Sequence, residues 1–280
     1  MEIGLTSFKT AEELSAKKIF SVFQNQTEKR FGQNFLFDEK INRKIVSAAG
    51  DLTDKVVMEV GPGPGGITLE ILKHPIKKLY VVEFDPRWAK AWCELSNLFD
   101  GKLEVVECNA LQFDEQRISP QVIISNLPYN ISSPLLFKWL RSFDKFEKLV
   151  LMFQKEVAER LFAPHNTKAY GKLSIMAQWK SSVEKVFDLE PGSFFPPPKV
   201  SSTVVKFVPY LYREDFQNFD KFSQLLNTAF LHRRKIVISS LKKFNKNIPM
   251  ILADFNYPQT VRAEEISVSD YIRLMKLLNE

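Results

Sequence analysis

The sequence has few cysteines and few histidines, and both shortages limit the chemistry that it can support. Only Cys93 and Cys108 are present, which is too few for a disulfide framework, and they form no C-x-x-C pair. We therefore expect a reducing compartment, the cytoplasm, with both thiols buried. The three histidines are scattered and have no Cys, Asp or Glu partner at metal-ligand spacing, so the sequence predicts no metal site.

Long apolar runs are also missing. No stretch approaches the roughly 20 apolar residues that a membrane span requires. The acidic residues Glu2, Glu12, Glu13 and Glu28 argue against a signal or transit peptide. We expect a polar or loosely helical extension over residues 1–29 and no membrane partner. What the chain has is 45% hydrophobic residues, enough for one large domain and a small one.

Short β-branched runs alternate with helical patterns from Val56 onward. This alternation predicts an α/β fold in which a mostly parallel sheet carries helices on both faces. We expect strands at 56–61, 78–83, 103–108, 121–125 and 149–153, and helices that begin near Gly65, Pro86, Ser133 and Lys155. After a helix at 171–180, the stretches 182–189 and 200–208 flank a proline-rich loop and predict an antiparallel strand pair at the end of the sheet.

The strand pattern ends at Pro209. The remaining sequence predicts helices at 221–230, 233–244 and 267–278, and Ser267 with Asp270 fits a capping box at the start of the last one. The sequence therefore predicts three parts, which are an N-terminal extension (1–29), an α/β domain (30–209) and a small all-helical domain (210–280).

A glycine-rich turn follows the first predicted strand. Gly61, Gly63 and Gly66 satisfy G-x-G-x-x-G, and the acidic residue Glu83 ends the next strand, where it could accept both hydroxyls of an adenosine ribose. The same spacing fits dinucleotide binding, although prolines inside the turn remove N–H donors that a pyrophosphate would use. The turn thus predicts a nucleoside site and leaves open whether it binds NAD or S-adenosylmethionine.

The fourth predicted strand runs into Asn126-Leu127-Pro128-Tyr129 at the carboxyl edge of the sheet, where open α/β sheets bind ligands. The Asn126 side-chain oxygen and the Leu127 or Pro128 carbonyl can accept the two hydrogens of an adenine N6 amine, which holds the nitrogen in line with a sulfonium methyl group. Tyr129 offers a face on which an extruded base can stack. Asn and Pro also form simple turns, but the glycine turn nearby favours a catalytic segment.

With these motifs in place, the sequence resembles the ribosomal RNA adenine N6-dimethyltransferase family, and in particular its small-subunit branch. The resemblance runs from about Arg30 to Leu278. It is carried by RFGQNFL at 30–36, EVGPG at 59–63, VEFD at 82–85, NLPYNIS at 126–132, QKEV at 154–157, YGKLS at 170–174, FFPPPKV at 194–200, and RAE with IS within 262–267.

The resemblance implies a Rossmann-like class I methyltransferase sheet and S-adenosylmethionine-dependent dimethylation of two adjacent adenosines in small-subunit ribosomal RNA during ribosome biogenesis. The implied cofactor-binding residues are Asn34, Leu36, Gly61, Glu83, Asn109 and Asn126. The implied catalytic residues are Asn126, Tyr129 and Phe194, with Phe194 stacking on the target base opposite Tyr129. The chain departs from the family at two positions, because Asn109 and Ser201 stand where the family commonly has aspartate.

One stretch of the helical region is basic only. No acidic residue lies between Asp220 and Asp254, and the formal net charge of the chain is +6. A charge run is often just a solvated helix face, so the resemblance decides for RNA contacts. The predicted RNA-binding residues are Arg233, Arg234, Lys235, Lys242 and Lys243. The implied partner is small-subunit ribosomal RNA or the pre-assembled small subunit, and we expect a monomer.

Three other functions stay open at this point. The chain could be a DNA adenine methyltransferase, or a methyltransferase-like nucleic-acid-binding assembly or transcription factor whose catalysis is dispensable. A nicotinamide-dependent reductase is disfavoured, because the Asn-Leu-Pro-Tyr segment is not followed by a Tyr-x-x-x-Lys pair.

Overall fold

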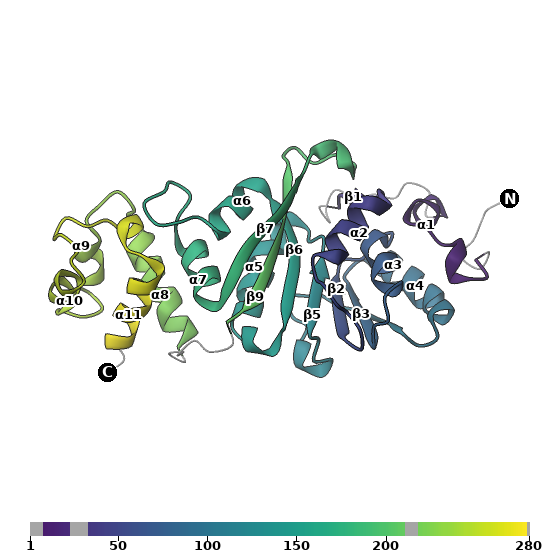
Figure 1. Ribbon diagram of the computed structural model, residues 1–280, viewed down its shortest axis with the longest axis horizontal. Helices are drawn as coiled ribbons and strands as arrows, with labels where there is room; N and C mark the ends of the chain where they lie inside the picture. The colour runs from purple at the N-terminus through teal and green to yellow at the C-terminus, as the bar shows by residue number, and fades with distance from the viewer. Residues whose placement is uncertain (1–7, 23–32, 211–217, 279–280) are drawn as a thin grey trace. The chain divides into compact units, whose positions relative to one another are not determined.

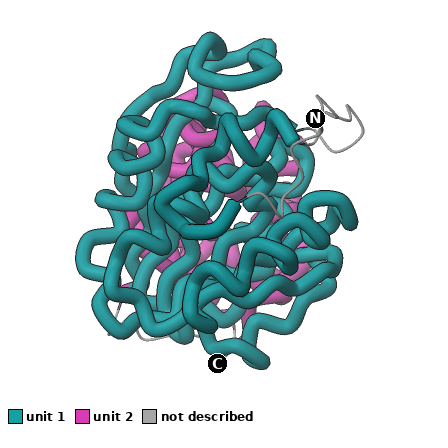
Figure 2. Tube along the Cα trace, turned by 90° about the vertical axis from the view of Figure 1, so that its right-hand side faces the viewer, with its two compact units in different colours: residues 1–155, 184–209 teal, residues 156–183, 210–280 magenta. Residues whose placement is uncertain are grey.

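The structure, a computed structural model, describes residues 8–22, 33–210 and 218–278. The chain divides into two compact units, which Figure 2 colours separately. Unit 1 comprises residues 1–155 and 184–209, and unit 2 comprises residues 156–183 and 210–280. Residues 156–183, which the sequence led us to include in the α/β domain, therefore group with the C-terminal helices.

A mixed sheet with the strand order β4-β3-β2-β5-β6-β9-β7 forms the centre of unit 1 (Figure 1). Neighbours from β4 to β6 pair in parallel, and β9 pairs antiparallel with β6. The strands are β2 (Val56–Val60), β3 (Lys78–Glu83), β4 (Leu103–Glu107), β5 (Val122–Ser125), β6 (Lys148–Gln154), β7 (Ser181–Leu189) and β9 (Ser202–Pro209). The predicted α/β class and mostly parallel sheet with an antiparallel end are confirmed.

The order of the strands follows from burial and from the path of the chain. Val57, Ile123 and Leu149, on the adjacent strands β2, β5 and β6, are completely buried, as expected for parallel strands covered on both faces. The chain runs from β2 outward to β3 and β4 and then returns to β5 on the other side of β2. Such a reversal opens a crevice at the carboxyl ends of the central strands, where open α/β sheets bind their ligands.

The helices of unit 1 are α1 (Ala16–Val22), α2 (Glu39–Ser47), α3 (Gly66–Leu72), α4 (Pro86–Leu95) and α5 (Tyr129–Leu140). Helix α2 was not predicted, although Asp38 caps it by accepting hydrogen bonds from the N–H groups of Lys40 and Ile41. Short 3-10 helices lie at η2 (Ala11–Glu13), η4 (Ser96–Phe99), η5 (Glu115–Arg117), η6 (Phe143–Lys145) and η7 (Pro191–Ser193).

Helix α5 begins at Tyr129 and not near Ser133, so the predicted start was wrong. The reason is that the Pro128 carbonyl accepts hydrogen bonds from the N–H groups of Ile131 and Ser132, both at 3.1 Å. The first turn of the helix therefore forms before Pro134, which lacks an N–H and lies inside the helix. Tyr129 is consequently fixed on a helix and does not lie in a loop.

A separate two-stranded sheet joins β1 (Phe35–Leu36) to β8 (Phe194–Phe195). The two strands are antiparallel, with Phe35 opposite Phe195 and Leu36 opposite Phe194. Neither strand was predicted, because two residues are too few for an alternating pattern to be read. This small sheet brings a segment near the N-terminus together with the proline-rich segment after β7.

Unit 2 is helical. Its elements are α6 (Lys155–Leu161, which starts at the last residue of unit 1), α7 (Lys172–Lys180), α8 (Phe219–Phe230), α9 (Val237–Leu241), α10 (Ile248–Asp254), η8 (Ala263–Glu265) and α11 (Val268–Leu277). Its core includes the aromatic side chains of Trp179 and Phe222, whose rings meet edge to face at 4.8 Å. Within the described ranges of the chain, no helix is long and apolar enough to cross a membrane.

The helix predicted at 233–244 was wrong in its first turn and at its end. Only Val237–Leu241 is helical, because Ile236 forms an isolated antiparallel bridge with Arg262 and the Val237 N–H donates to the Val261 carbonyl at 2.9 Å. The basic residues just before Ile236 therefore lie in a turn. Helix α10 was missed altogether.

The predicted capping box at the last helix is confirmed in one half. The Ser267 hydroxyl accepts from the Asp270 N–H at 3.1 Å, as an N-cap should. The Asp270 carboxylate, however, accepts from the Ser267 hydroxyl and from the Tyr257 hydroxyl, while the Ser267 N–H donates to Tyr257. In a full capping box the Ser267 N–H would donate to the Asp270 side chain. Here it donates to the Tyr257 hydroxyl instead.

Candidate active site

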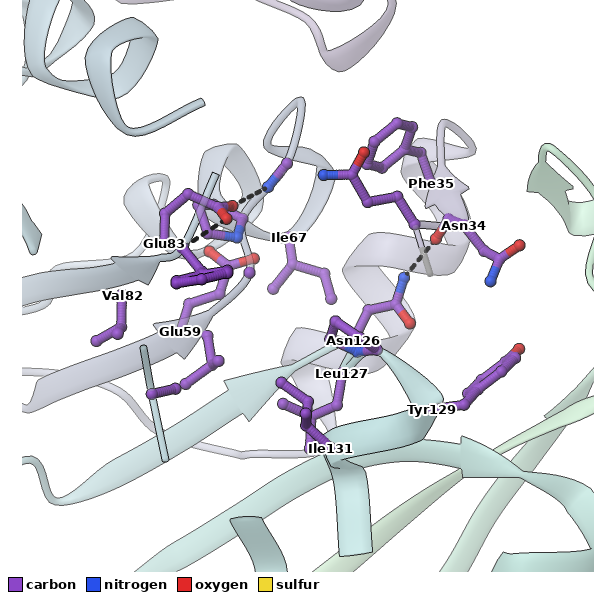
Figure 3. Close-up of a pocket in the computed structure, with 18 of the residues that line it drawn as sticks. Asn34, Phe35, Glu59, Ile67, Val82, Glu83, Asn126, Leu127, Tyr129 and Ile131 are labelled. Carbon is purple, nitrogen blue, oxygen red and sulfur yellow. Dashed lines mark hydrogen bonds between the residues drawn. The ribbon is translucent and has the colours of Figure 1, made fainter. Parts of the chain in front are cut away.

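A cavity of about 220 Å³ lies in unit 1 where β2, β3, β4 and β5 end. The predicted cofactor and target residues that line it are Asn34, Leu36, Gly61, Glu83, Asn109, Asn126 and Tyr129. In Figure 3, Asn126 lies between Glu83 at one end of the pocket and Tyr129 at the other. The structure therefore brings together residues that are spread over about a hundred positions of sequence, as expected at a sheet edge of this topology.

The glycine turn has no room for a Cβ atom at Gly63, Gly65 or Gly66. A Cβ atom on Gly65, whose φ is +88°, would lie 2.0 Å from the Trp92 ring, and one on Gly63 would lie 2.7 Å from the Phe35 ring. The Trp92 indole N–H also donates to the Gly63 carbonyl at 2.8 Å. Trp92 was missed from the sequence, because nothing in the pattern of helix α4 indicates that a buried tryptophan supports the turn.

Glu83 is the buried acid at the end of β3. Its Oε1 accepts from the N–H groups of Phe84 and Asp85, both at 2.8 Å, and its Oε2 accepts from the Gly63 N–H at 3.4 Å. Burial raises the pKa of the Glu83 carboxyl to about 7, against the opposing effect of these hydrogen bonds. The carboxyl group is thus held in one orientation and changes its charge near neutral pH.

A second buried acid, Glu59, lies in the same pocket and was missed as a site residue. It is 1% exposed, and its Oε2 accepts from the Thr68 hydroxyl at 2.6 Å. Burial, with a smaller contribution from the charge of Glu83, raises the pKa of Glu59 to about 8. A carboxylic acid that is neutral at pH 7 can donate a hydrogen bond as well as accept one.

Asn109 follows β4 and uses its side-chain oxygen locally. Oδ1 accepts from the Leu111 N–H at 3.0 Å, which closes a turn. Lys138 holds the same loop, because its ammonium group donates to the carbonyls of Ala110, at 2.7 Å, and Phe113, and to Glu115. The loop that carries Asn109 is therefore fixed from helix α5.

The prediction that both thiols are buried was wrong. Cys93 is exposed on α4, and Cys108 is partly buried and lines the pocket. Partial burial raises the pKa of each thiol, so neither is an activated nucleophile. In the part of the chain that the structure describes, no cluster of three or more His, Cys, Asp or Glu residues could hold a metal ion.

The Asn-Leu-Pro-Tyr segment is held at both ends. The Asn126 side-chain amide donates to the Asn34 carbonyl at 2.9 Å (Figure 3). The contact engages Nδ2, so Oδ1 is the atom of this side chain that can accept from an amine. Because the Pro128 carbonyl accepts the first helical N–H groups of α5, the Leu127 carbonyl is the better candidate for the second acceptor.

Tyr129 is anchored by its hydroxyl, which lies 2.6 Å from the hydroxyl of Ser202 on β9. Ser202 is completely buried. Partial burial raises the pKa of the Tyr129 hydroxyl, so the ring stays neutral. A fixed, neutral ring at the pocket rim suits the stacking of a base.

Phe194 does not line this pocket. It is 5% exposed and packs in the core of unit 1, whereas its neighbour Phe195 is 47% exposed. The alternation of side chains along β8 explains the difference, because Phe194 lies opposite the buried Leu36 and Phe195 faces outward. The structure therefore does not bring Phe194 and Tyr129 together on the pocket wall.

The basic residues of unit 2 differ in their surroundings. Arg234, Lys235 and Lys243 line an open hollow together with His232 and Arg262, and Lys242 is exposed at the end of α9. Arg233 instead donates to the carbonyls of Lys168, at 2.6 Å, and Thr167, at 2.7 Å, and faces Glu264 at 3.7 Å. Arg233 thus ties the turn to the segment before α7.

A family model described as ribosomal RNA adenine dimethylase matches residues 24–280. The ribosomal RNA small subunit methyltransferase A of Paramagnetospirillum magneticum is 40% identical over 253 residues, which cover 90% of each chain. The protein of the same name from Gluconobacter oxydans is also 40% identical, over 89% of this chain and 82% of that one.

Two solved structures share the fold. The dimethyladenosine transferase from Plasmodium falciparum matches with a TM-score of 0.72 and 29% identity, over 88% of this chain and 97% of that one. The 23S rRNA methyltransferase ErmE matches with a TM-score of 0.66 over 88% of this chain and 100% of that one. Its identity is 22%, so this second likeness concerns the fold alone.

Proposed function

The chain belongs to the ribosomal RNA adenine dimethylase family, and from this membership and its pocket we propose that it dimethylates N6 of adenines in small-subunit ribosomal RNA. The methyl donor is S-adenosylmethionine. The observation that carries the proposal is the geometry of Asn126, whose amide nitrogen is bound to the Asn34 carbonyl and whose oxygen can therefore face an amine beside the nucleoside pocket.

The residues of the pocket fit this cofactor. Gly61, Gly63 and Gly66 line the pocket without side chains, and Glu83 supplies a carboxylate that accepts ribose hydroxyls. Gln33 and Asn42 also line the pocket, and their oxygens Oε1 and Oδ1 are buried acceptors with no hydrogen-bond partner among the described residues. An ammonium group at the methionine end of the cofactor would supply the missing donors. When bound, the cofactor provides an electrophilic methyl group on its sulfonium.

The protein groups act on the amine. Asn126 Oδ1 and the Leu127 carbonyl accept its two hydrogens, which directs the nitrogen lone pair toward the methyl group and stabilises the positive charge that develops. Tyr129 stacks on the extruded adenine. No strong base is needed, because the methylated amine is acidic enough to lose its proton to water.

The proposal assigns the RNA contact to unit 2. Arg234, Lys235, Lys242 and Lys243 are exposed and bind phosphates, whereas Arg233 positions the turn that carries two of them. The substrate is the small-subunit RNA or the pre-assembled subunit. We further propose that the protein works as a monomer in the cytoplasm, where such a substrate is available.

Transfer of labelled methyl groups to undermethylated small ribosomal subunits tests the proposal. We expect label in the RNA as dimethyladenosine, and Asn126→Ala should lower the rate by about 10²–10³-fold, as the loss of one positioned hydrogen-bonding group does. Asn97→Ala, outside the pocket, is the matched control. Label in duplex DNA or protein and none in RNA would refute the proposal.

Two variants test which side chain stacks on the target base on the face opposite Tyr129. The family resemblance assigns it to Phe194, while Phe195 is the exposed ring of the same strand. If Phe194 meets the base after β8 shifts, Phe194→Leu raises KM for the RNA and Phe195→Leu does not. The reverse result would move the stacking role to Phe195.

A further inference from the structure

Helix α1 lies outside the segment that the family model matches, which starts at residue 24. It is nevertheless built into unit 1. Ile19 is completely buried and Phe20 is 8% exposed, and both belong to the main hydrophobic core. The charged side chains of α1, Lys17 and Lys18, are exposed. One face of the helix therefore packs in the core of unit 1, and the other face is exposed to solvent.

Phe20 contacts the strand that covers the cofactor pocket. Its ring meets Phe35 edge to face at 5.7 Å and Phe37 at 5.3 Å, and it also meets Phe195 of β8 at 5.6 Å. Trp88 also stacks on Phe20, with the ring centroids 6.5 Å apart. One side chain thus packs against both strands of the small β1–β8 sheet, and Figure 1 shows α1 close to β1.

Strand β1 and Asn34, the residue before it, contact the pocket at three points. The Asn34 carbonyl accepts from Asn126, the Phe35 ring fills the space where a Cβ on Gly63 would lie, and the Leu36 carbonyl lies 2.5 Å from where a Cβ on Gly66 would lie. The position of this segment therefore determines both how the glycine turn is packed and how Asn126 is oriented.

The small sheet has little to hold it by itself. It has two residue pairs, and even a whole isolated hairpin is marginal in water. The hydrogen bond from the Asn42 side chain to the Leu36 carbonyl is long, at 3.4 Å. Aromatic packing on Phe35, from Phe20 of α1 and from Trp88 of α4, each at 5.7 Å, then keeps β1 against the glycine turn.

We infer that Phe20 is a positioning residue for cofactor binding: by packing on Phe35 and Phe37 it holds β1 over the glycine turn and so preorganises the pocket. The inference rests on the proposed function, because the cofactor of that pocket is the one proposed above. A pocket that is already ordered has a lower entropy cost of binding. Loss of the Phe20 packing should therefore lower the affinity for the cofactor more than it slows the chemical step.

The test is calorimetric titration of S-adenosylmethionine and its product S-adenosylhomocysteine into the wild type and four variants of the full chain. Phe20→Ala removes the ring, and Phe20→Leu keeps an apolar side chain. Lys17→Ala changes the exposed face of the same helix. Phe146→Ala removes a ring of similar burial, 5% exposed, which packs on Phe143 just before β6 begins, at the edge of the sheet opposite the pocket.

We expect Phe20→Ala to raise Kd about tenfold, equivalent to about 1.4 kcal/mol, and Phe20→Leu to have a smaller effect. Lys17→Ala and Phe146→Ala should leave Kd unchanged, although Phe146→Ala lowers Tm as Phe20→Ala does. In methyl transfer, Phe20→Ala should raise KM for the cofactor more than it lowers kcat.

The possible failures are distinguishable. If the wild type binds neither compound, the proposed function is wrong. If the wild type binds and Phe20→Ala binds equally well, or if Phe146→Ala weakens binding as much, Phe20 contributes only general stability and the inference is overturned. Should Phe20→Ala not fold, Phe20→Leu is judged by the same comparison with Phe146→Ala.

Discussion

The pocket of unit 1 and the basic hollow of unit 2 carry their proposed roles in opposite ways. In the pocket, the groups are buried and their positions are set by backbone, as the Glu83 carboxyl is by the N–H groups of Phe84 and Asp85. In the hollow, Arg234 and Lys235 are exposed side chains on a turn. Replacing a buried, preorganised group therefore costs much free energy of binding or folding, whereas replacing an exposed charge in water costs little. If this contrast holds, substitutions in the pocket have larger effects than substitutions in the hollow.

The largest effect is expected at the glycine turn. Gly65→Ala places a Cβ atom 2.0 Å from the Trp92 ring and forces an L residue into a φ of +88°. Left-handed strain and overpacking together should lower the free energy of unfolding by about 3 kcal/mol. Urea denaturation measures this. Gly192→Ala is the control, because its Cβ would have nothing within 4 Å. Equal stability of the two variants would mean that the turn is not rigid.

The second effect concerns the charge of Glu83. Since burial raises its pKa to about 7, the carboxyl is protonated below that pH and is ionised above it. The ionised form accepts the ribose hydroxyls, so affinity for S-adenosylmethionine should rise with pH up to about 7 and then level off. Glu83→Gln should weaken binding about 10- to 100-fold, the loss of charge-assisted hydrogen bonds.

Calorimetry over that pH range checks both parts of the prediction. Glu83→Gln should lose the pH dependence. Glu59→Gln is a useful control, because the pKa of Glu59 is raised to about 8 and its own titration would otherwise overlap. A pH profile that survives in Glu83→Gln would assign the titration to another group.

The same contrast explains what could be predicted from the sequence. The strands β2 to β6 and the residues Gly61, Glu83 and Asn126 were placed correctly at one sheet edge, because local apolar patterns and glycine motifs determine them. Phe194 and Trp92 could not be placed, because their surroundings depend on contacts between distant segments. The helix predicted at 233–244 failed for the same reason, since the bridge from Ile236 to Arg262 overrides helical propensity.

Single substitutions of the basic residues of unit 2 should each have a small and independent effect on RNA affinity. Arg234→Ala and Lys235→Ala should each weaken RNA binding several-fold and reduce the slope of log affinity against log salt by about one. Arg233→Ala should leave that slope unchanged and lower Tm, because its guanidinium binds the carbonyls of Thr167 and Lys168. Filter binding of small-subunit RNA at several salt concentrations measures the slopes. Equal slopes for all three variants would remove the distinction that we draw within this basic run.

The smallest effect tests the departure at Asn109. Its Oδ1 accepts from the Leu111 N–H, so the other terminal atom, Nδ2, is a donor and cannot accept from the cofactor's adenine amine. Asn109→Asp keeps the turn and replaces that donor with an acceptor. It should therefore increase the affinity for S-adenosylhomocysteine about fivefold, which is about 1 kcal/mol of binding free energy. Asn130→Asp adds the same charge at the exposed rim of the pocket and controls for general attraction. With S-inosylhomocysteine, which has no amine at that position, the gain should vanish or reverse, whereas a gain that persists would show that charge alone is responsible.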